Sequence, residues 1–325
     1  MNTYCNHNPR LSTAMRFVTL AVAALLAIPS YGWSKKGHQI TAYIAQRHMT
    51  STTYNEINKL LDGDNIVYWA SWLDQARNQQ QYAHTKTWHY LNVDADETYE
   101  TRYHNPNGDV VTAVEYAYDV LTDNTSSKSD RQFALKVVIH VIADAHQPMH
   151  VGHGTDSGGN GIKLTYEGSS TNLHSLWDYD VVENTHSWSY YDWQQNIDVL
   201  SKAENDRLAE GDIEDWVRQN IRIAADIYKA FPRNSDVTGG KLDQWGDTVE
   251  TLMLSGGLRL AKWLNIVFDE NYSDAPIIEA DDDTQLVDVY SISGVCLRSQ
   301  VPVTEATDGM PSGLYIVNRT KVLVK

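Results

Sequence analysis

Helical periodicity runs through residues 37–268 of this 325-residue chain and then stops, and this change constrains the fold more than any other feature. Apolar residues recur at the three- and four-residue spacing of amphipathic helices. We expect helices over 37–48, 53–61, 69–79, 110–122, 129–146, 172–183, 205–230 and 243–268, and a short strand over 162–166. Ser129 and Gln132 have the spacing of a capping box at the start of the fifth helix.

Beyond about residue 270 the pattern changes to short β-type runs broken by Gly and Pro. These runs cover residues 287–292, 295–297, 313–317 and 322–324. An acidic stretch, residues 279–283, precedes them. The predicted fold class is therefore mainly α with a small C-terminal β module. We predict four parts: a signal peptide at 1–32, a helical domain at 33–272, an acidic linker at 273–284 and the β module at 285–325.

The first 32 residues have the pattern of a secretory signal peptide. Arg10 and Arg16 give a positive start, and residues 17–28 form an apolar run too short to span a bilayer. Ser30 and Gly32 place small residues before a cut at Trp33. We therefore expect an exported protein that is periplasmic, on the cell surface or extracellular, without membrane insertion, and monomeric.

The net charge limits how this chain could bind nucleic acid, and its cysteine content limits whether a disulfide could stabilise it. The chain has 26 Lys and Arg against 42 Asp and Glu, a net charge of −16. This charge argues against a protein held on DNA by a basic patch, so bound metal ions would have to neutralise the phosphates of any nucleic acid. Cys5 leaves with the leader and Cys296 remains alone, which excludes an intramolecular disulfide in the mature chain.

The candidate chemistry lies in pairs of histidine and aspartate at helical spacing. His140 and Asp144 are four residues apart, as are His174 and Asp178, so each pair projects from one helix face. Further candidate ligands are His38, Asp74, His89 and His150. The remaining histidines are predicted to lie on the surface or behind the site: His48, His84, His104, His146, His153 and His186.

Imidazole and carboxylate groups are the usual ligands of catalytic zinc, and a carboxylate can bridge two ions. The α-amine that a cut before Trp33 would free has a pKa of about 7.7–8, so it deprotonates easily enough to bind a metal as well. His38 lies five residues beyond that amine. The sequence therefore predicts a metal site built from both the histidine–aspartate pairs and the new amino terminus.

Taken in order, these motifs resemble the zinc-dependent single-strand-specific nucleases of fungi, plants and bacteria (the S-one/P-one family). The resemblance covers residues 33–270 and rests on Trp33-x4-His38, Trp72-x-Asp74, Trp88-His89-Tyr90, His140-x3-Asp144-x-His146-Gln147-Pro148-x-His150, Gly158-Gly159-Asn160 and Asn172-Leu173-His174-x2-Trp177-Asp178. It implies a mostly helical fold, shared with zinc phospholipases C, around three Zn²⁺ ions. The missing disulfides depart from the fungal and plant members.

The resemblance also implies a ligand for every position of the trinuclear site. One ion would be bound by Asp74, His89 and His140 and would share Asp144 with a second. That second ion would also take His38 and the amino and carbonyl groups of Trp33. The third ion would be bound by His150, His174 and Asp178.

The implied activity is cleavage of the P–O3′ bond in single-stranded DNA and RNA, which leaves 5′-phosphates, together with 3′-nucleotidase activity. Asp74 would orient the attacking water, and Arg77 would stabilise the charge on the phosphoryl group and the departing oxygen. Tyr90 would stack on an unpaired base. Asn92 stands where fungal members carry an Asp that bonds the base, and Asn160 is a further expected substrate contact.

Two alternatives remain open at this level. A zinc-dependent phospholipase C of the same fold shares the amino-terminal Trp and similar His/Asp spacings, but carries Glu where Asp178 stands and lacks the stacking aromatic. A non-enzymatic zinc-binding or adhesion module is harder to reconcile with Asp74 and Arg77.

The tail carries a second resemblance. Residues 289–294 and 313–317, with the terminal Lys325, resemble the C-terminal sorting modules of exported Bacteroidetes proteins, which would address the chain to secretion machinery. The alternative for this segment is a β appendage with no address function.

Overall fold

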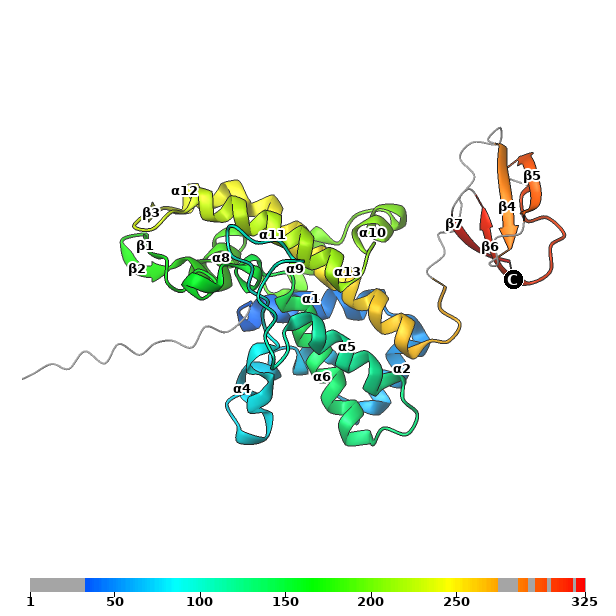
Figure 1. Ribbon diagram of the computed structural model, residues 1–325, viewed down its shortest axis with the longest axis horizontal. Helices are drawn as coiled ribbons and strands as arrows, with labels where there is room; N and C mark the ends of the chain where they lie inside the picture. The colour runs from blue at the N-terminus through cyan, green and yellow to red at the C-terminus, as the bar shows by residue number, and fades with distance from the viewer. Residues whose placement is uncertain (1–32, 274–285, 292–295, 303–304, 318–319, 325) are drawn as a thin grey trace, which may run out of the picture.

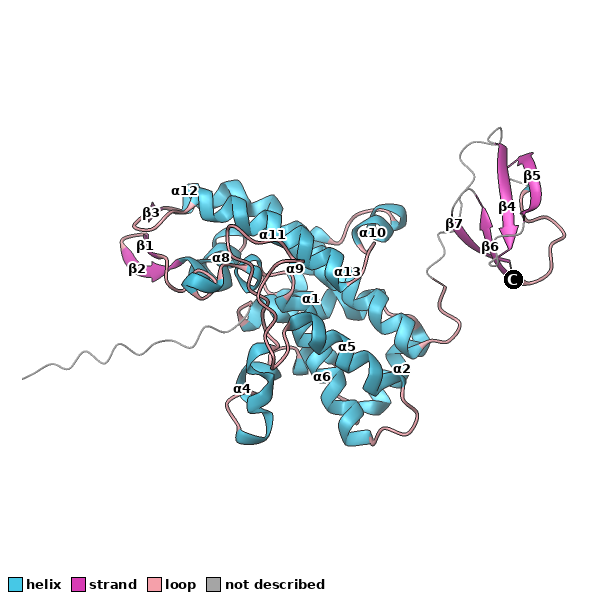
Figure 2. Cartoon of the chain, viewed as in Figure 1, coloured by secondary structure: helices cyan, strands magenta, loops and turns pink. Residues whose placement is uncertain are grey.

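The computed structural model describes residues 33–273, 286–291, 296–302, 305–317 and 320–324, and these are mainly helical (Figures 1 and 2). The longer helices are α1 (Lys35–His48), α2 (Ser51–Leu60), α5 (Val110–Thr122), α6 (Lys128–Asp144), α9 (Tyr190–Ile197), α11 (Ile213–Ala230) and α13 (Gly246–Phe268). Short helical segments join them: α3 (Ile66–Trp69), α4 (Trp72–Ala76), η1 (Gln80–Thr87), η2 (Pro148–Val151), η3 (Gly154–Asp156), α7 (Leu173–Ser175), η4 (Leu176–Asp180), α8 (Val181–Thr185), α10 (Lys202–Leu208), α12 (Gly239–Leu242) and η5 (Asp243–Trp245).

Some predicted parts lie outside this description. The predicted signal peptide (1–32), nearly all of the predicted acidic linker and the last residue of the tail are outside the described residues. Within the described ranges, every helix is too short or too polar to cross a bilayer.

The helical core forms around α1 and α6, the two helices that carry the candidate ligands His38, His140 and Asp144. α1 packs against α13, α9, α3 and α6, while α6 also packs against α5. The approach of α1 to α13 requires glycine, because a Cβ on Gly257 would lie 2.5 Å from the Cβ of Ile44. This close packing fixes α1, and with it His38, against the rest of the core.

Three predicted helices are interrupted in the structure. The helix expected over 205–230 is divided between α10 and α11 at Gly211, which has φ = +83°. The helix expected over 69–79 is divided between α3 and α4, and the Ala70 carbonyl at the break accepts a hydrogen bond from His140. The helix expected over 172–183 contains the π-helical segment η4, a kind of irregularity that is frequent at functional sites.

The start of α6 differs from the predicted capping box. The cap is Ser127, whose side chain accepts a hydrogen bond from the Asp130 amide. Ser129 lies inside the helix, and the Gln132 side chain instead donates to the carbonyl of Leu60. The prediction was wrong because Ser127 offers the same hydroxyl two residues earlier, where the backbone is still extended.

Two small sheets complete the described chain. In the first, β1 (Lys163–Tyr166) pairs antiparallel with β2 (Ser169–Asn172) and parallel with β3 (Asp236–Val237). The second has the order β5-β4-β6-β7, with antiparallel pairing throughout. Its strands are β4 (Leu286–Ser291), β5 (Cys296–Pro302), β6 (Gly313–Val317) and β7 (Thr320–Val324). This sheet has its own small core of Val287, Val289, Ala306 and Val317.

Candidate metal centre

Three groups of buried imidazole and carboxylate side chains lie close enough to hold metal ions. In each group the potential ligand atoms are within 4.8 Å of one another. The groups are His38, His140 and Asp144; Asp74, His89 and His140; and His150, His174 and Asp178. All eight side chains were candidate ligands in the sequence, so the fold brings together every predicted side-chain ligand.

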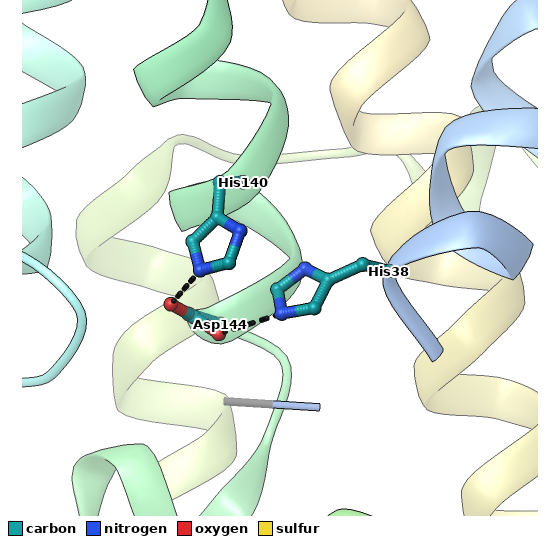
Figure 3. A group of neighbouring side chains, drawn as sticks. All are labelled: His38, His140 and Asp144. Atoms are coloured by element: carbon teal, nitrogen blue, oxygen red, sulfur yellow. Dashed lines mark ion pairs between the residues drawn. The ribbon is translucent and has the colours of Figure 1, made fainter. Parts of the chain in front are cut away.

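Asp144 is the carboxylate that the histidines share. It is fully buried on the last turn of α6, and its Oδ2 lies 2.9 Å from Nδ1 of His89 and 3.1 Å from Nε2 of His140. Its Oδ1 lies 3.4 Å from Nε2 of His38, which reaches in from α1 (Figure 3). The two oxygens therefore face different imidazoles, an arrangement suited to a carboxylate that bridges two ions.

Asp74 and Arg77 lie one helical turn apart, on α4 and directly after it. Oδ1 of Asp74 is 3.7 Å from Nε2 of His140 and 3.8 Å from Nδ1 of His89. The Arg77 guanidinium lies 3.6 Å from the same oxygen. Arg77 therefore places a fixed positive charge at the edge of the histidine cluster.

The third group is held by the segments after α6. Nε2 of His174 lies 3.4 Å from Oδ2 of Asp178, and the His150 and His174 rings have centroids 5.1 Å apart. Gly158 makes this packing possible, because it has φ = +63° and a Cβ there would lie 2.5 Å from the carbonyl oxygen of Met149.

Backbone carbonyls orient three of the imidazoles. Nδ1 of His140 donates to the carbonyl of Ala70 at 2.8 Å. In the same way, Nδ1 of His150 donates to His89 and Nδ1 of His174 donates to Gly158. Each Nδ1 carries the proton in these bonds, so the neutral ring keeps its Nε2 lone pair for a ligand. Such bonds fix the tautomer and the orientation of metal-binding histidines.

Burial sets the charge state of most groups in the site. It lowers the pKa of His89 and of His174 to about 3 and that of His38 well below its ordinary value. Burial also opposes the charged form of His140, but Asp144 and Asp74 outweigh it and raise the pKa of that imidazole. Most of the histidines are thus neutral, as metal binding requires.

Several buried nitrogen and oxygen atoms that could bind a metal have no hydrogen-bond partner among the described residues. These are both ring nitrogens of His38, Nε2 of His89, Nε2 of His174 and Oδ2 of Asp178. Burial also raises the pKa of Asp178 well above its ordinary value. Buried polar atoms normally find partners, and a cation would satisfy these atoms together and favour the ionised carboxylate. The residues present therefore fit a group of bound metal ions.

Trp33 lies beside this cluster. Its side chain is fully buried, and the amide of Ser34 donates to the carbonyl of Asp178 at 3.0 Å. Gly37 packs on it so closely that a Cβ would lie 2.7 Å from the Cβ of Trp33. The first described residue is thus fixed next to the segment that carries Asp178.

A cleft of about 240 Å³ opens onto the cluster. Its lining includes the metal-ligand candidates His89, His150 and His174 together with Arg77, Tyr90, Asn92 and Asn160. The cleft therefore gathers all the residues that the sequence assigned to substrate binding. Asp94, which follows Asn92 by two residues, accepts hydrogen bonds from Thr155 and ties the two loops of the cleft together.

The other histidines behave differently from one another. His146 is buried rather than on the surface; its Nδ1 donates to the carbonyl of Ile142 and its Nε2 accepts from Arg259. His48 pairs with Asp198, and His186 pairs with Glu250. None of these is in the three metal-binding groups.

Gln147 was not among the site residues predicted from the sequence. This side chain is fully buried, and both ends of its amide are hydrogen-bonded, one to Asp178 and the other to the backbone amide of Met149. Its position in the run His146-Gln147-Pro148 was the available signal, but an amide is not a usual zinc ligand and gave no reason to single it out.

A helical body with a shared, buried cluster of histidine and aspartate ligands under a cleft is the architecture of a metal-dependent enzyme. A family model described as S1/P1 Nuclease matches residues 33–269. The chain belongs to the S1/P1 nuclease family and is therefore an enzyme that hydrolyses phosphodiester bonds.

Individual relatives agree with this assignment. Nuclease S1 of Aspergillus oryzae is 27% identical over 281 residues, which are 77% of this chain and 95% of that protein. Endonuclease 2 of Arabidopsis thaliana is 27% identical over 79% of this chain and 98% of its own length. Nuclease P1 of Penicillium citrinum is 24% identical over 72% of this chain and 97% of its own length.

Proposed function

We propose that this protein is a zinc-dependent endonuclease that cleaves single-stranded DNA and RNA at the P–O3′ bond and also removes 3′-phosphates from nucleotides. The observation that carries the proposal is the junction of the buried His/Asp cluster with a cleft that Arg77, Tyr90 and Asn92 line. In the hydrolysis, water adds to phosphorus, the P–O3′ bond breaks, and the 3′-oxygen leaves with a proton. The products carry 5′-phosphates.

The proposed metal content is three Zn²⁺ ions per chain. One ion is held by Asp74, His89 and His140 and shares Asp144 with a second, which His38 and the backbone of Trp33 complete. The third is held by His150, His174 and Asp178. Zinc supplies Lewis-acid stabilisation of phosphate oxygens and lowers the pKa of water. The positive charge of the three ions would also attract the phosphates of nucleic acid to a chain whose own net charge is negative.

The residues around the ions have separate tasks in this proposal. Asp74 accepts a proton from the attacking water and orients it. Arg77, at the edge of the cleft, donates hydrogen bonds to the phosphoryl oxygens as negative charge develops there. Asn160, which also lines the cleft, contacts the bound nucleotide.

Tyr90 and Asn92 are proposed to bind an unstacked base. Tyr90 directly follows His89, and both side chains line the cleft. A base can reach the ring only when it has left the double helix, which accounts for a preference for single strands. The Asn92 amide offers both a donor and an acceptor, so we propose that it tolerates several bases.

Replacement of Tyr90 by alanine should weaken substrate binding more than it slows chemistry. Loss of base stacking costs about 1–3 kcal/mol, so KM for a single-stranded oligonucleotide should rise about 5- to 150-fold with kcat within a few-fold of the parent. Tyr90→Phe keeps the ring and should behave like the parent. A kcat loss with unchanged KM in Tyr90→Ala would contradict the stacking role.

The proposed function is tested by product analysis. Protein beginning at Trp33 and loaded with zinc should release 5′-phosphorylated products from single-stranded DNA and RNA, and much more slowly from duplex DNA. A chelator should abolish the reaction, and added zinc should restore it. Products with 3′-phosphates would refute the bond assignment. Hydrolysis of phosphatidylcholine without any nucleic acid cleavage would instead favour a phospholipase C.

For the rest of the chain we propose a signal peptide at 1–32, the nuclease domain at 33–272, a linker at 273–284 and a β module at 285–325. The start of the family match at Trp33 supports the cut before that residue. The β module would direct the exported, monomeric protein to secretion machinery, and the final location would be periplasmic, on the cell surface or extracellular.

A further inference from the structure

Gln147 joins Asp178 to the turn that carries His150 through the two ends of one amide. Its Nε2 donates to Oδ1 of Asp178, and its Oε1 accepts from the backbone amide of Met149. Met149 belongs to η2, the turn that carries His150, and the His150 amide also donates to the carbonyl of Gln147 at 2.9 Å. Gln147 itself is fully buried, so water does not compete for these bonds.

The two partners of the amide leave it one orientation. A backbone amide only donates hydrogen bonds, so Oε1 must face Met149, and Nε2 is then the atom that faces Asp178. The bond to Oδ1 leaves Oδ2 of Asp178, 3.4 Å from Nε2 of His174, as the oxygen without a hydrogen-bond partner. The amide thereby determines which carboxylate oxygen is free for a metal ion.

We propose that Gln147 is the positioning residue of the metal site formed by His150, His174 and Asp178, and that it sets the metal affinity of this site alone. The inference rests on the proposed metal content. The side-chain hydrogen bonds of Gln147 go to Asp178 and to the Met149 amide, and within the described ranges none goes to His38, Asp74 or His89 of the other two groups. Removal of a hydrogen-bond partner of a metal ligand typically lowers the metal affinity about 10- to 100-fold.

The test uses Gln147→Glu, which keeps the size of the side chain and the acceptor for Met149 but removes the donor to Asp178. A carboxylate there would also face the Asp178 carboxylate. We expect purified protein to hold two zinc ions instead of three, or to bind one of the three about 10- to 100-fold more weakly in a competition titration with a chelator. Gln147→Leu removes both bonds and serves if the glutamate variant fails to fold.

Asn220 offers a matched control. It is also a buried amide, and its Nδ2 donates to the carbonyl of Ala145 at the end of α6 rather than to a candidate ligand side chain. Asn220→Asp makes the same chemical change as Gln147→Glu and should lower the free energy of unfolding while three ions remain bound. Equal loss of zinc from both variants would overturn the inference, because the effect would then be general.

A double variant shows which ion is lost. His174→Ala should hold two ions, and His174→Ala combined with Gln147→Glu should still hold two, because both changes remove the same one. A double variant with one ion, or a folded Gln147→Glu with three ions of unchanged affinity, overturns the inference. Parent protein that binds three ions but cleaves no nucleic acid would refute the proposed function and leave this inference standing. Parent protein with fewer than three ions would refute the metal content and the inference with it.

Discussion

Asp144→Asn should reduce kcat/KM on single-stranded DNA by about 10³-fold or more, the largest effect expected from a single substitution in this chain. Both oxygens of Asp144 face imidazoles of the cluster, so an amide in its place would offer only one oxygen to two proposed ions. Metal ions contribute several kcal/mol of transition-state stabilisation, and each 1.36 kcal/mol is a factor of ten in rate. Metal analysis of the same sample should show that at least one ion has been lost.

A second aspartate provides the control for this substitution. Asp198 also pairs with a histidine, His48, at 2.9 Å, but the pair lies outside the metal-binding groups. Asp198→Asn should leave activity and zinc content unchanged. Full activity and full zinc content in Asp144→Asn would show that the carboxylate is not shared between ions.

Arg77→Ala should lower kcat about 10²- to 10³-fold while the full complement of zinc stays bound. The guanidinium lines the cleft beside Asp74, and we propose that it stabilises charge that develops only as the P–O3′ bond breaks. Loss of one such donor from an active site costs about this much. Steady-state kinetics and metal analysis of the same preparation measure the two quantities.

The lysine variant separates charge from geometry. Arg77→Lys keeps the positive charge but not the planar fork of donors, so it should recover only part of the lost rate. Zinc loss from Arg77→Ala would instead mean that the guanidinium supports the metal ligands through Asp74. An unchanged kcat in Arg77→Ala would show that Arg77 does not stabilise the transition state.

Helices could be predicted from periodicity, but their interruptions could not. α5 begins and ends where the pattern predicted, at Val110 and Thr122. The break before α4 and the π-helical segment at Asp178 both involve partners distant in the sequence. Nδ1 of His140 donates a hydrogen bond to the carbonyl of Ala70, and the amide of Ser34 donates one to the carbonyl of Asp178. α9 was missed altogether, because its eight residues are too few for a clear apolar repeat.

The candidate site was predictable to different degrees. Spacing alone placed His140 with Asp144 and His174 with Asp178, because i and i+4 share a helix face. That His38 and His89 meet Asp144 depends on how α1 and the segment after η1 pack, and only the family resemblance supplied it. The role of Gln147 required the structure, because its importance lies in two contacts that no sequence spacing records.

The candidate ligands come from α1, α4, α6, η2 and the α7–η4 segment, parts of the chain separated by up to 140 residues between His38 and Asp178. The helical part has no cysteine to link these segments covalently. Bound ions would therefore be the cross-links between these segments, and such cross-links form reversibly. Each site adds RT ln(1 + [Zn²⁺]/Kd) to the free energy of unfolding, about 2.7 kcal/mol when free zinc is one hundred times Kd. We therefore expect the resistance of this protein to heat and proteases to rise with the zinc concentration of its surroundings.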